Sequence, residues 1–213
     1  MSARNLRDRT NGLYGRYGKR VFDLVLSIPS FILLSPVFLI ASVLIKIETP
    51  GTATFAQERI GRGGRPFKLY KFRTMVKDAS KMGPPITPTN DPRITKVGKL
   101  LRKYKIDEML QIANIIKGDM SVIGPRPEIE KYIKKFKDDY SKILKIKPGM
   151  TDYALIVFRN EEEILSKFND VEEGYIQEVM PEKIKLYKKY MDEMSLLTDI
   201  KIFFKTIWEI LKR

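Results

Sequence analysis

The 213-residue sequence contains neither cysteine nor histidine. Without cysteine the chain has no disulfide framework and no thiol nucleophile, and without histidine it lacks the commonest general base and metal ligand. Any nucleophilic, acid–base or metal chemistry must therefore fall to aspartate and glutamate. Acidic residues are themselves scarce, because 26 of them stand against 40 lysines and arginines and leave a formal charge of +14. This excess predicts an anionic partner, which could be nucleic acid, acidic lipid headgroups or a phosphorylated substrate.

Charge is also missing from one long apolar run, Leu24 to Ile45, with the sequence LVLSIPSFILLSPVFLIASVLI. As a helix this run would be about 33 Å long, close to the roughly 30 Å hydrocarbon core of a bilayer. Large apolar side chains lie all round the helix and leave no polar stripe to face water, which favours a membrane element over a buried core helix. The run starts too late, is too long and lacks an A-x-A exit for a cleaved signal peptide, so we expect a retained anchor.

Two features predict that this helix enters the membrane and leaves by the same face. Pro29 and Pro36 each remove a helical donor and crowd the preceding turn, so a bend is expected, and the Ser35 hydroxyl can satisfy a carbonyl freed by Pro36. Cations, which prefer the cytosolic side, flank both ends. They are Arg4, Arg7, Arg9, Arg16, Lys19 and Arg20 before the run, and Lys46, Arg59, Arg62 and Arg65 after it. A single-pass helix is the alternative, because proline also occurs in spanning helices.

The sequence predicts a mostly helical α+β membrane protein in three parts. Residues 1–20 are expected to form a loose cationic arm that lies on lipid headgroups. Residues 21–47 form the re-entrant membrane helix with its Ser-Pro kink. Residues 48–213 are expected to form a cytosolic catalytic domain with a C-terminal interfacial helix.

A β-hairpin is expected at the start of the cytosolic domain, with strands over Ala53–Gln57 and Pro66–Met75. The glycine-rich stretch between them is interpreted as a turn, because it lacks the spacing of a phosphate-binding loop. A proline-rich segment over residues 78–93 predicts a flexible loop.

The C-terminal stretch DIKIFFKTIWEILKR is amphipathic. One helical face carries Ile200, Phe203, Phe204, Ile207, Trp208 and Leu211. Its aromatic residues and flanking lysines favour a helix that lies in the membrane interface over a core helix.

Asp107 and Glu108 are expected to open a short helix. Asp107 can serve as its N-cap, and Gly118 supplies the C-terminal stop. The predicted apolar stripe comprises Met109, Ile112, Ala113 and Ile116. A pair of acidic residues at this position is usually capping alone, but the helix N-terminus would also keep the Asp107 carboxylate ionised. An ionised carboxylate suits either a Mg²⁺ ligand or a nucleophile.

Three arginines could bring donors to phosphate oxygens, namely Arg102, Arg126 and Arg159. The sequence Gly124-Pro125-Arg126-Pro127 predicts a rigid turn that fixes the direction of one guanidinium.

Taken together, these motifs resemble the monotopic phosphoglycosyl transferases of bacterial glycoconjugate assembly. The resemblance covers roughly residues 17–212. The motifs that carry it are Ser35-Pro36 within the apolar run, LYKFRTM at 69–75, DPRITKVGKLLR at 91–102, Asp107-Glu108, KGDMSVIGPRPE at 117–128 and KPGMT at 147–151. Two departures matter. Leu110 stands where many members have proline, and TDYALIVFRNEEE follows the last motif in place of a glycine-containing segment, so the choice of substrate cannot be transferred.

The resemblance implies transfer of a sugar 1-phosphate from a UDP-sugar to polyprenyl (undecaprenyl) phosphate, with release of UMP. It implies that Asp107 is the nucleophile, that a covalent aspartyl-phosphosugar forms, and that Glu108 is the partner of Asp107. Mg²⁺ is the expected cofactor, with Asp107 as its ligand. Arg102, Arg126 and Arg159 are expected around the phosphates.

On this interpretation the protein is an enzyme at the cytosolic face of the bacterial inner membrane, with phospholipid as a partner and no nucleic acid. Two rival interpretations stay open. A membrane-tethered nucleic-acid binder would explain the charge, although the sequence shows no recognition-helix or RNP-type motif. A non-catalytic lipid-binding scaffold would explain the anchor, although it gives no reason for the grouping of Arg102, Asp107 and Arg126.

Overall fold

The computed structural model describes residues 12–83 and 91–212, which are mostly helical and include two small two-stranded sheets. The helices are α2 (Lys19–Glu48), α3 (Lys96–Lys103), α4 (Gln111–Lys117), α5 (Glu130–Lys135), α6 (Lys137–Ile143), α7 (Tyr153–Val157), α8 (Glu161–Leu165), α9 (Val171–Gly174), α10 (Met180–Glu193) and α11 (Leu196–Leu211). The strands are β1 (Thr54–Ile60), β2 (Pro66–Phe72), β3 (Ser121–Ile123) and β4 (Gly149–Thr151). The predicted α+β class with a predominance of helix is confirmed.

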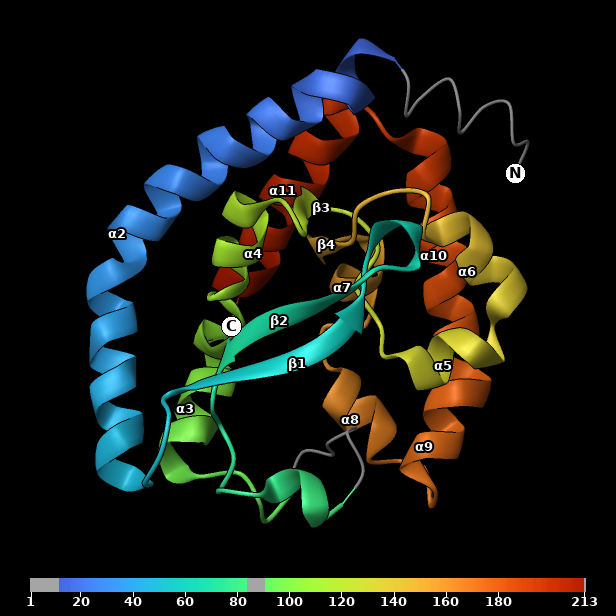
Figure 1. The fold of residues 1–213 in the computed structure, drawn as a ribbon. Helices are drawn as coiled ribbons and strands as arrows, with labels where there is room; N and C mark the ends of the chain where they lie inside the picture. Colours follow the sequence, from blue (N-terminus) through green and yellow to red (C-terminus); the bar gives the residue numbers. More distant parts are fainter. Residues whose placement is uncertain (1–11, 84–90, 213) are drawn as a thin grey trace.

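The apolar run forms one continuous helix, α2, which Figure 1 shows as a long arc along one side of the molecule. Pro29 and Pro36 both lie inside it. The Ser35 hydroxyl donates to the Ile32 carbonyl at 2.7 Å, and this is the carbonyl that Pro36 deprives of its N–H donor. The predicted role of Ser35 is thereby confirmed, and the chain stays helical through both prolines.

The helix that contains α2, Tyr14–Glu48, is long and apolar enough to cross a membrane by length and composition. Only 17% of its most apolar stretch is buried inside the protein, which is typical of a membrane element rather than a core helix. Helical structure begins earlier than expected, because Tyr14–Gly18 forms a π-helical turn that runs directly into α2. The rest of the predicted cationic arm, residues 1–11, lies outside the described residues, as does most of the predicted loop, residues 84–90.

A buried carboxylate fastens the start of α2 to the C-terminal helix. Asp199, at the start of α11, is fully buried. It lies 2.6 Å from the Lys19 ammonium and accepts hydrogen bonds from the hydroxyls of Tyr14 and Tyr190. All of these donors converge on one side chain, so the membrane helix and α11 share a single polar joint.

Two further polar residues join the same end of α2 to the centre of the molecule. The Arg20 guanidinium donates to the carbonyls of Ile115 and Ile116 near the end of α4, at 2.6 and 2.7 Å. Asp23 accepts from the Ser121 hydroxyl and from the next backbone N–H of β3, both at 2.8 Å. The first turns of α2 therefore contact the rest of the protein through polar side chains, whereas many apolar side chains of its later turns are exposed.

The predicted hairpin is confirmed. Strands β1 and β2 pair antiparallel, with Glu58 opposite Lys68 and Phe55 opposite Lys71. The glycine-rich stretch turns the chain, with Gly63 in the left-handed region at φ +71°. Leu69 joins the main core, whereas Phe72 joins a smaller apolar cluster beneath α2, so the two faces of β2 are both covered.

The main core surrounds α10, which Figure 1 shows on the side of the molecule opposite α2. Its fully buried large side chains include Tyr140, Tyr187, Tyr190, Met180, Met191 and Ile202. The smaller cluster comprises Phe38, Ala41 and Ile45 of α2 together with Ala53, Phe72 and Leu101. This second cluster holds the hairpin and α3 against the far half of α2.

The helix expected to open at Asp107 begins later. Asp107 lies in the 3₁₀ turn Ile106–Glu108, and α4 starts at Gln111 with Leu110 as N-cap. The prediction that Asp107 is the N-cap is wrong, because a separate turn precedes the helix. Gly118 does end the helix, in the left-handed region at φ +97°. The buried residues of α4 are Gln111, Ile112, Asn114 and Ile115, a face displaced from the predicted stripe.

Helix α11 turns Asp199, Ile202 and Thr206 toward the protein. Its exposed large apolar residues are Leu196, Leu197, Phe204, Ile207, Trp208 and Ile210. This division into a packed face and an uncovered apolar face accords with the amphipathic pattern of the sequence.

Replacement of Asp199 tests the joint between α2 and α11. Asp199→Ala should lower the free energy of unfolding by roughly 3–5 kcal/mol, because it leaves the buried Lys19 ammonium without its counter-charge. Thermal unfolding in detergent should show a midpoint lower by roughly 6–20 °C. Asp138→Ala, which removes an exposed carboxylate of α6, is the control and should change the midpoint by less than about 4 °C. Equal shifts in the two variants would contradict the joint.

Candidate active site

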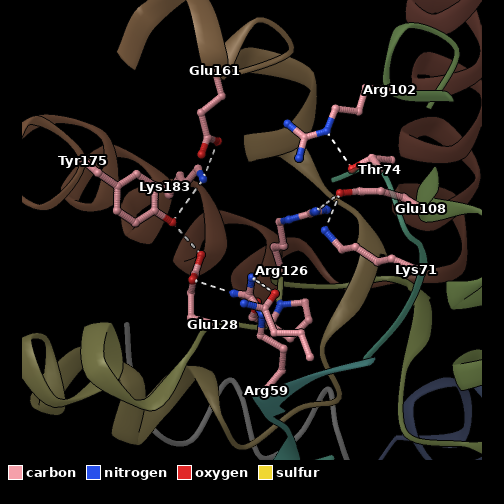
Figure 2. Close-up of polar contacts among 12 residues, drawn as sticks. Arg59, Lys71, Thr74, Arg102, Glu108, Arg126, Glu128, Glu161, Tyr175 and Lys183 are labelled. Carbon is pink, nitrogen blue, oxygen red and sulfur yellow. Dashed lines mark hydrogen bonds and ion pairs between the residues drawn. The ribbon is translucent and has the colours of Figure 1, made fainter. Parts of the chain in front are cut away.

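Glu108 is held by two cations that come from two different elements. Its Oε1 accepts from the Lys71 ammonium of β2 at 2.9 Å and also from the Arg126 guanidinium, as Figure 2 shows. Burial alone would raise the pKa of Glu108, but Arg126 and Lys71 together lower it well below its usual value. Glu108 is therefore a fixed negative charge that joins β2 to the turn around Arg126.

Asp107, the adjacent residue, has the opposite character. It is buried, and its Oδ1 has no hydrogen-bond partner within the described residues. Burial, followed by the negative charge of Glu108, raises the pKa of Asp107, and the cations of Lys71, Arg102 and Lys105 offset this only in part. The expectation that a helix N-terminus keeps Asp107 ionised is corrected here, because Asp107 precedes the helix and lies in a desolvated position beside another carboxylate.

Arg102 reaches the site from α3. Its Nε donates to the hydroxyl of Thr74 at 3.0 Å, just after the end of β2. Close packing enforces this position, since a Cβ on Gly98 would lie 2.1 Å from the Thr74 carbonyl oxygen. Only glycine permits α3 to approach the chain this closely, so Gly98 sets the distance from which Arg102 acts on Asp107.

The turn that carries Arg126 is braced by Asp152. The backbone N–H of Arg126 donates to Asp152 Oδ2 at 3.1 Å, while Asp152 Oδ1 caps α7 by accepting from the Leu155 N–H at 2.6 Å. Burial raises the pKa of Asp152 from 3.8 to about 6. The turn also packs tightly on β4, because a Cβ on Gly149 would lie 2.1 Å from the Gly124 nitrogen. Arg126 Nη1 keeps no partner within the described residues.

A second buried network lies beside Arg126 and was not predicted from the sequence. Glu128 accepts from Arg59 at 3.0 Å and from the Tyr175 hydroxyl at 2.6 Å. The Lys183 ammonium lies 3.4 Å from the same hydroxyl and 2.5 Å from Glu161 of α8. Figure 2 shows these side chains as a chain of contacts running from α8 toward β1. Only Glu128 stood within a recognised motif, and no local pattern singles out Lys183.

The structure therefore brings together four of the predicted site residues, namely Arg102, Asp107, Glu108 and Arg126. Arg159 has a different contact, since its Nη1 lies 3.0 Å from Glu209 of α11. It lines a cavity of about 450 Å³ with Val157, Asn160, Glu163 and Ile164. Its role in phosphate binding stays a prediction. Lys71 belongs to the recognised LYKFRTM motif, yet sequence analysis assigned it no role at this site.

Within the described residues, no group of three or more acidic side chains is placed to hold a metal ion. Asp107 nevertheless offers an unpartnered, buried carboxylate oxygen, which is a hard donor of the kind that Mg²⁺ prefers. Magnesium commonly takes one or two protein carboxylates and completes its shell with substrate phosphates and water. The donor set therefore fits a magnesium ion that arrives with a diphosphate.

Comparison with known proteins identifies the family of the chain. The model of the family described as bacterial sugar transferase matches residues 14–213 of the chain. The chain thus belongs to the bacterial sugar transferase family.

Several curated relatives have specific activities in their names. The chain is 36% identical over 200 residues to a UDP-N-acetylgalactosamine-undecaprenyl-phosphate N-acetylgalactosaminephosphotransferase of Aeromonas hydrophila, covering 91% of this chain and 43% of that protein. It is 35% identical over 196 residues to the UDP-glucose:undecaprenyl-phosphate glucose-1-phosphate transferase of Escherichia coli, covering 90% and 39%. The chain therefore spans less than half the length of these two relatives. Against the exopolysaccharide production protein ExoY of Sinorhizobium fredii, 32% identity over 208 residues covers 91% of the chain and 85% of the relative.

The raised pKa of Asp152 predicts a particular dependence of stability on pH. A carboxyl with a folded pKa of about 6 and an unfolded value of 3.8 stabilises the folded state below pH 4 and loses this contribution as the pH rises through 6. The loss amounts to at most roughly 3 kcal/mol. Asp152→Asn cannot ionise, so the thermal midpoint of the wild type should fall relative to that of the variant between pH 4.5 and pH 7.

The slope against pH is the informative quantity in this comparison, because the amide also loses the acceptor for the Arg126 N–H at every pH. Asp138→Asn, which changes an exposed carboxylate, should leave the slope of the wild type unchanged. An Asp152→Asn curve parallel to that of the wild type would show that Asp152 ionises normally in the folded protein.

Proposed function

We propose that this protein transfers a sugar 1-phosphate from a UDP-sugar to polyprenyl phosphate, giving polyprenyl-diphosphate-sugar and UMP. The observation that carries the proposal is Asp107, a buried carboxylate with an unpartnered oxygen, placed beside Lys71, Arg102 and the Glu108–Arg126 pair. The family of the chain and the names of its relatives supply the class of substrates. Those relatives name different sugars, so the identity of the sugar is left to a screen of UDP-sugars for UMP release.

In the proposed reaction the Asp107 carboxylate attacks the β-phosphorus of the UDP-sugar. An aspartyl oxygen–phosphorus bond forms, the bond to the bridging oxygen breaks, and UMP leaves with that oxygen. The phosphate of the polyprenol then attacks the same phosphorus and releases Asp107 as a free carboxylate. Arg102 and the unpartnered Nη1 of Arg126 are placed to bind phosphoryl oxygens and stabilise the charge that gathers on them.

Glu108 takes a positioning role in this scheme rather than a proton-transfer role. A general acid or base works best with a pKa near the operating pH, whereas Arg126 and Lys71 lower the pKa of Glu108 far from that range, against the effect of burial. Its charge instead fixes where Lys71 and Arg126 point. Asp107 has its pKa raised by burial, and a more basic carboxylate is the better nucleophile once it has ionised.

Magnesium, when bound with the donor, would be held by Asp107 and would neutralise charge on the diphosphate of the UDP-sugar as UMP leaves. The chain's own contribution is to keep the carboxylate desolvated and to aim the arginines.

Asp107→Asn tests the nucleophile. The amide keeps the shape of the side chain but cannot attack phosphorus, so turnover should fall by at least roughly 10³-fold while thermal stability stays near that of the wild type. With a UDP-sugar alone, the wild type should release at most one UMP per active site and gain the mass of one sugar phosphate, measured by intact-protein mass spectrometry. Polyprenyl phosphate should remove that mass.

The control variant is Asp138→Asn, which changes an exposed aspartate of α6 and should retain full activity. An adduct on Asp107→Asn, or a release of UMP that strictly needs both substrates together, would contradict covalent catalysis. Direct displacement with Asp107 as a metal ligand would then replace it.

For the membrane we propose a monotopic, re-entrant arrangement at the cytosolic face of the inner membrane, with phospholipid against α2 and against the uncovered face of α11. Three observations support it: α2 bends as an arc, Ser35 satisfies the carbonyl freed by Pro36, and the polar first turns of α2 are bonded to the cytosolic domain. This geometry places the soluble donor and the lipid-borne acceptor at one headgroup-level site.

The absence of native cysteine makes this topology easy to test with single cysteines. Leu13→Cys and Lys201→Cys introduce thiols at two exposed positions on either side of α2. In intact cells a membrane-impermeant maleimide should label neither, and after lysis it should label both, with a periplasmic marker protein confirming that the reagent is active. Adding Pro36→Ala should expose some of the Leu13→Cys thiol to the periplasm, since a straighter helix can span. Periplasmic labelling of Leu13→Cys alone would rule out re-entrance.

A further inference from the structure

Gln111 is a buried polar side chain that the fold itself leaves unsatisfied. It is fully buried at the start of α4, and among the residues that the structure describes neither its Oε1 nor its Nε2 has a hydrogen-bond partner. Within the described residues it is the only buried side chain with two polar atoms in this condition. A buried amide without partners costs roughly 1–3 kcal/mol for each unmade bond, so a purely structural glutamine would be a poor choice at this position.

The position of Gln111 relates it to the nucleophile. The 3₁₀ turn that holds Asp107 runs through Met109 and Leu110 directly into α4, so Gln111 follows Asp107 by about one helical turn. Two other site atoms are likewise without partners, Asp107 Oδ1 and Arg126 Nη1. The unpartnered set therefore combines an acceptor on the nucleophile, a cationic donor, and an amide that can donate and accept.

From these positions we infer that the Gln111 amide binds the transferred phosphoryl group, donating from Nε2 to one of its non-bridging oxygens. The inference rests on the proposed phosphosugar transfer. Arg126 Nη1 and Gln111 Nε2 are donors that find no acceptor within the described residues. A phosphoryl group carries several acceptor oxygens and could accept from both. Gln111 is then a substrate-binding residue whose bond is made only when the donor enters.

The discriminating variant is Gln111→Met, which keeps the length of the side chain and removes both polar atoms. Because it removes an unsatisfied buried amide, the thermal midpoint of the free protein should stay the same or rise by up to roughly 4 °C. Formation of the covalent adduct from the UDP-sugar should nevertheless slow by about 10²-fold. Gln177→Met, at an exposed glutamine, is the matched control and should change neither quantity.

Sulfur substitution in the donor identifies the bond itself. The two β-phosphorothioate diastereomers of the UDP-sugar each replace one non-bridging oxygen by sulfur, a weaker acceptor. For one diastereomer the wild type should be slowed, and Gln111→Met should lose most of that slowing, because the affected bond is already absent. A general distortion of the site would instead slow oxygen and sulfur donors by the same factor.

The outcomes separate the two levels of the proposal. An unchanged sulfur effect in Gln111→Met, or a lowered midpoint with a uniform loss of rate, would overturn the role of Gln111 while leaving phosphosugar transfer intact. A wild-type protein that forms no adduct with any UDP-sugar would overturn the proposed function and this inference together.

Discussion

One carboxylate oxygen, Oε1 of Glu108, organises the site because Lys71 and Arg126 both donate to it. Lys71 comes from β2 and Arg126 from the turn after β3, so this shared contact joins the hairpin to the parallel β3–β4 pair. Removing Glu108 would leave two partly buried cations without their shared counter-charge, which is strongly destabilising. The same contact also fixes the charges around Asp107. This one interaction therefore sets both the positions of Lys71 and Arg126 and the charges around Asp107.

Helix α2 adds a second constraint, because its first turns and its apolar middle meet different surroundings. Its first turns are tied to α4, β3 and α11 through Arg20, Asp23 and Lys19, whereas its apolar middle is largely uncovered by the protein. Arg20 donates to carbonyls near the end of α4, the helix that follows the turn containing Asp107. A membrane that holds α2 would thus also set the depth of Asp107 relative to the headgroups, as the proposed reaction between a soluble donor and a lipid-borne acceptor requires.

Features that depend on a few neighbouring residues could be predicted from the sequence. The bond of Ser35 to the Ile32 carbonyl, the hairpin and the helix stop at Gly118 are of this kind. Features that depend on distant elements could not. The pKa of Asp107 is raised because distant elements bury its side chain. No local sequence pattern predicts where those elements lie. The contacts of Lys183 with Tyr175 and of Arg159 with Glu209 join segments whose approach no local pattern encodes.

The contrast between Asp107 and Glu108 follows from this arrangement. The two carboxylates are adjacent in the chain, yet burial and the neighbouring charge raise the pKa of Asp107, whereas Arg126 and Lys71 lower that of Glu108 despite its burial. Two carboxyl groups whose pKa values are pushed apart can take different tasks. In the proposed reaction an incoming diphosphate would raise the pKa of Asp107 further, so the cations of Lys71 and Arg102, which lower this pKa, would be needed to keep enough of the carboxyl ionised to attack. On the proposed mechanism, a site without histidine or cysteine thus obtains a nucleophile and a fixed counter-charge from one Asp-Glu dipeptide.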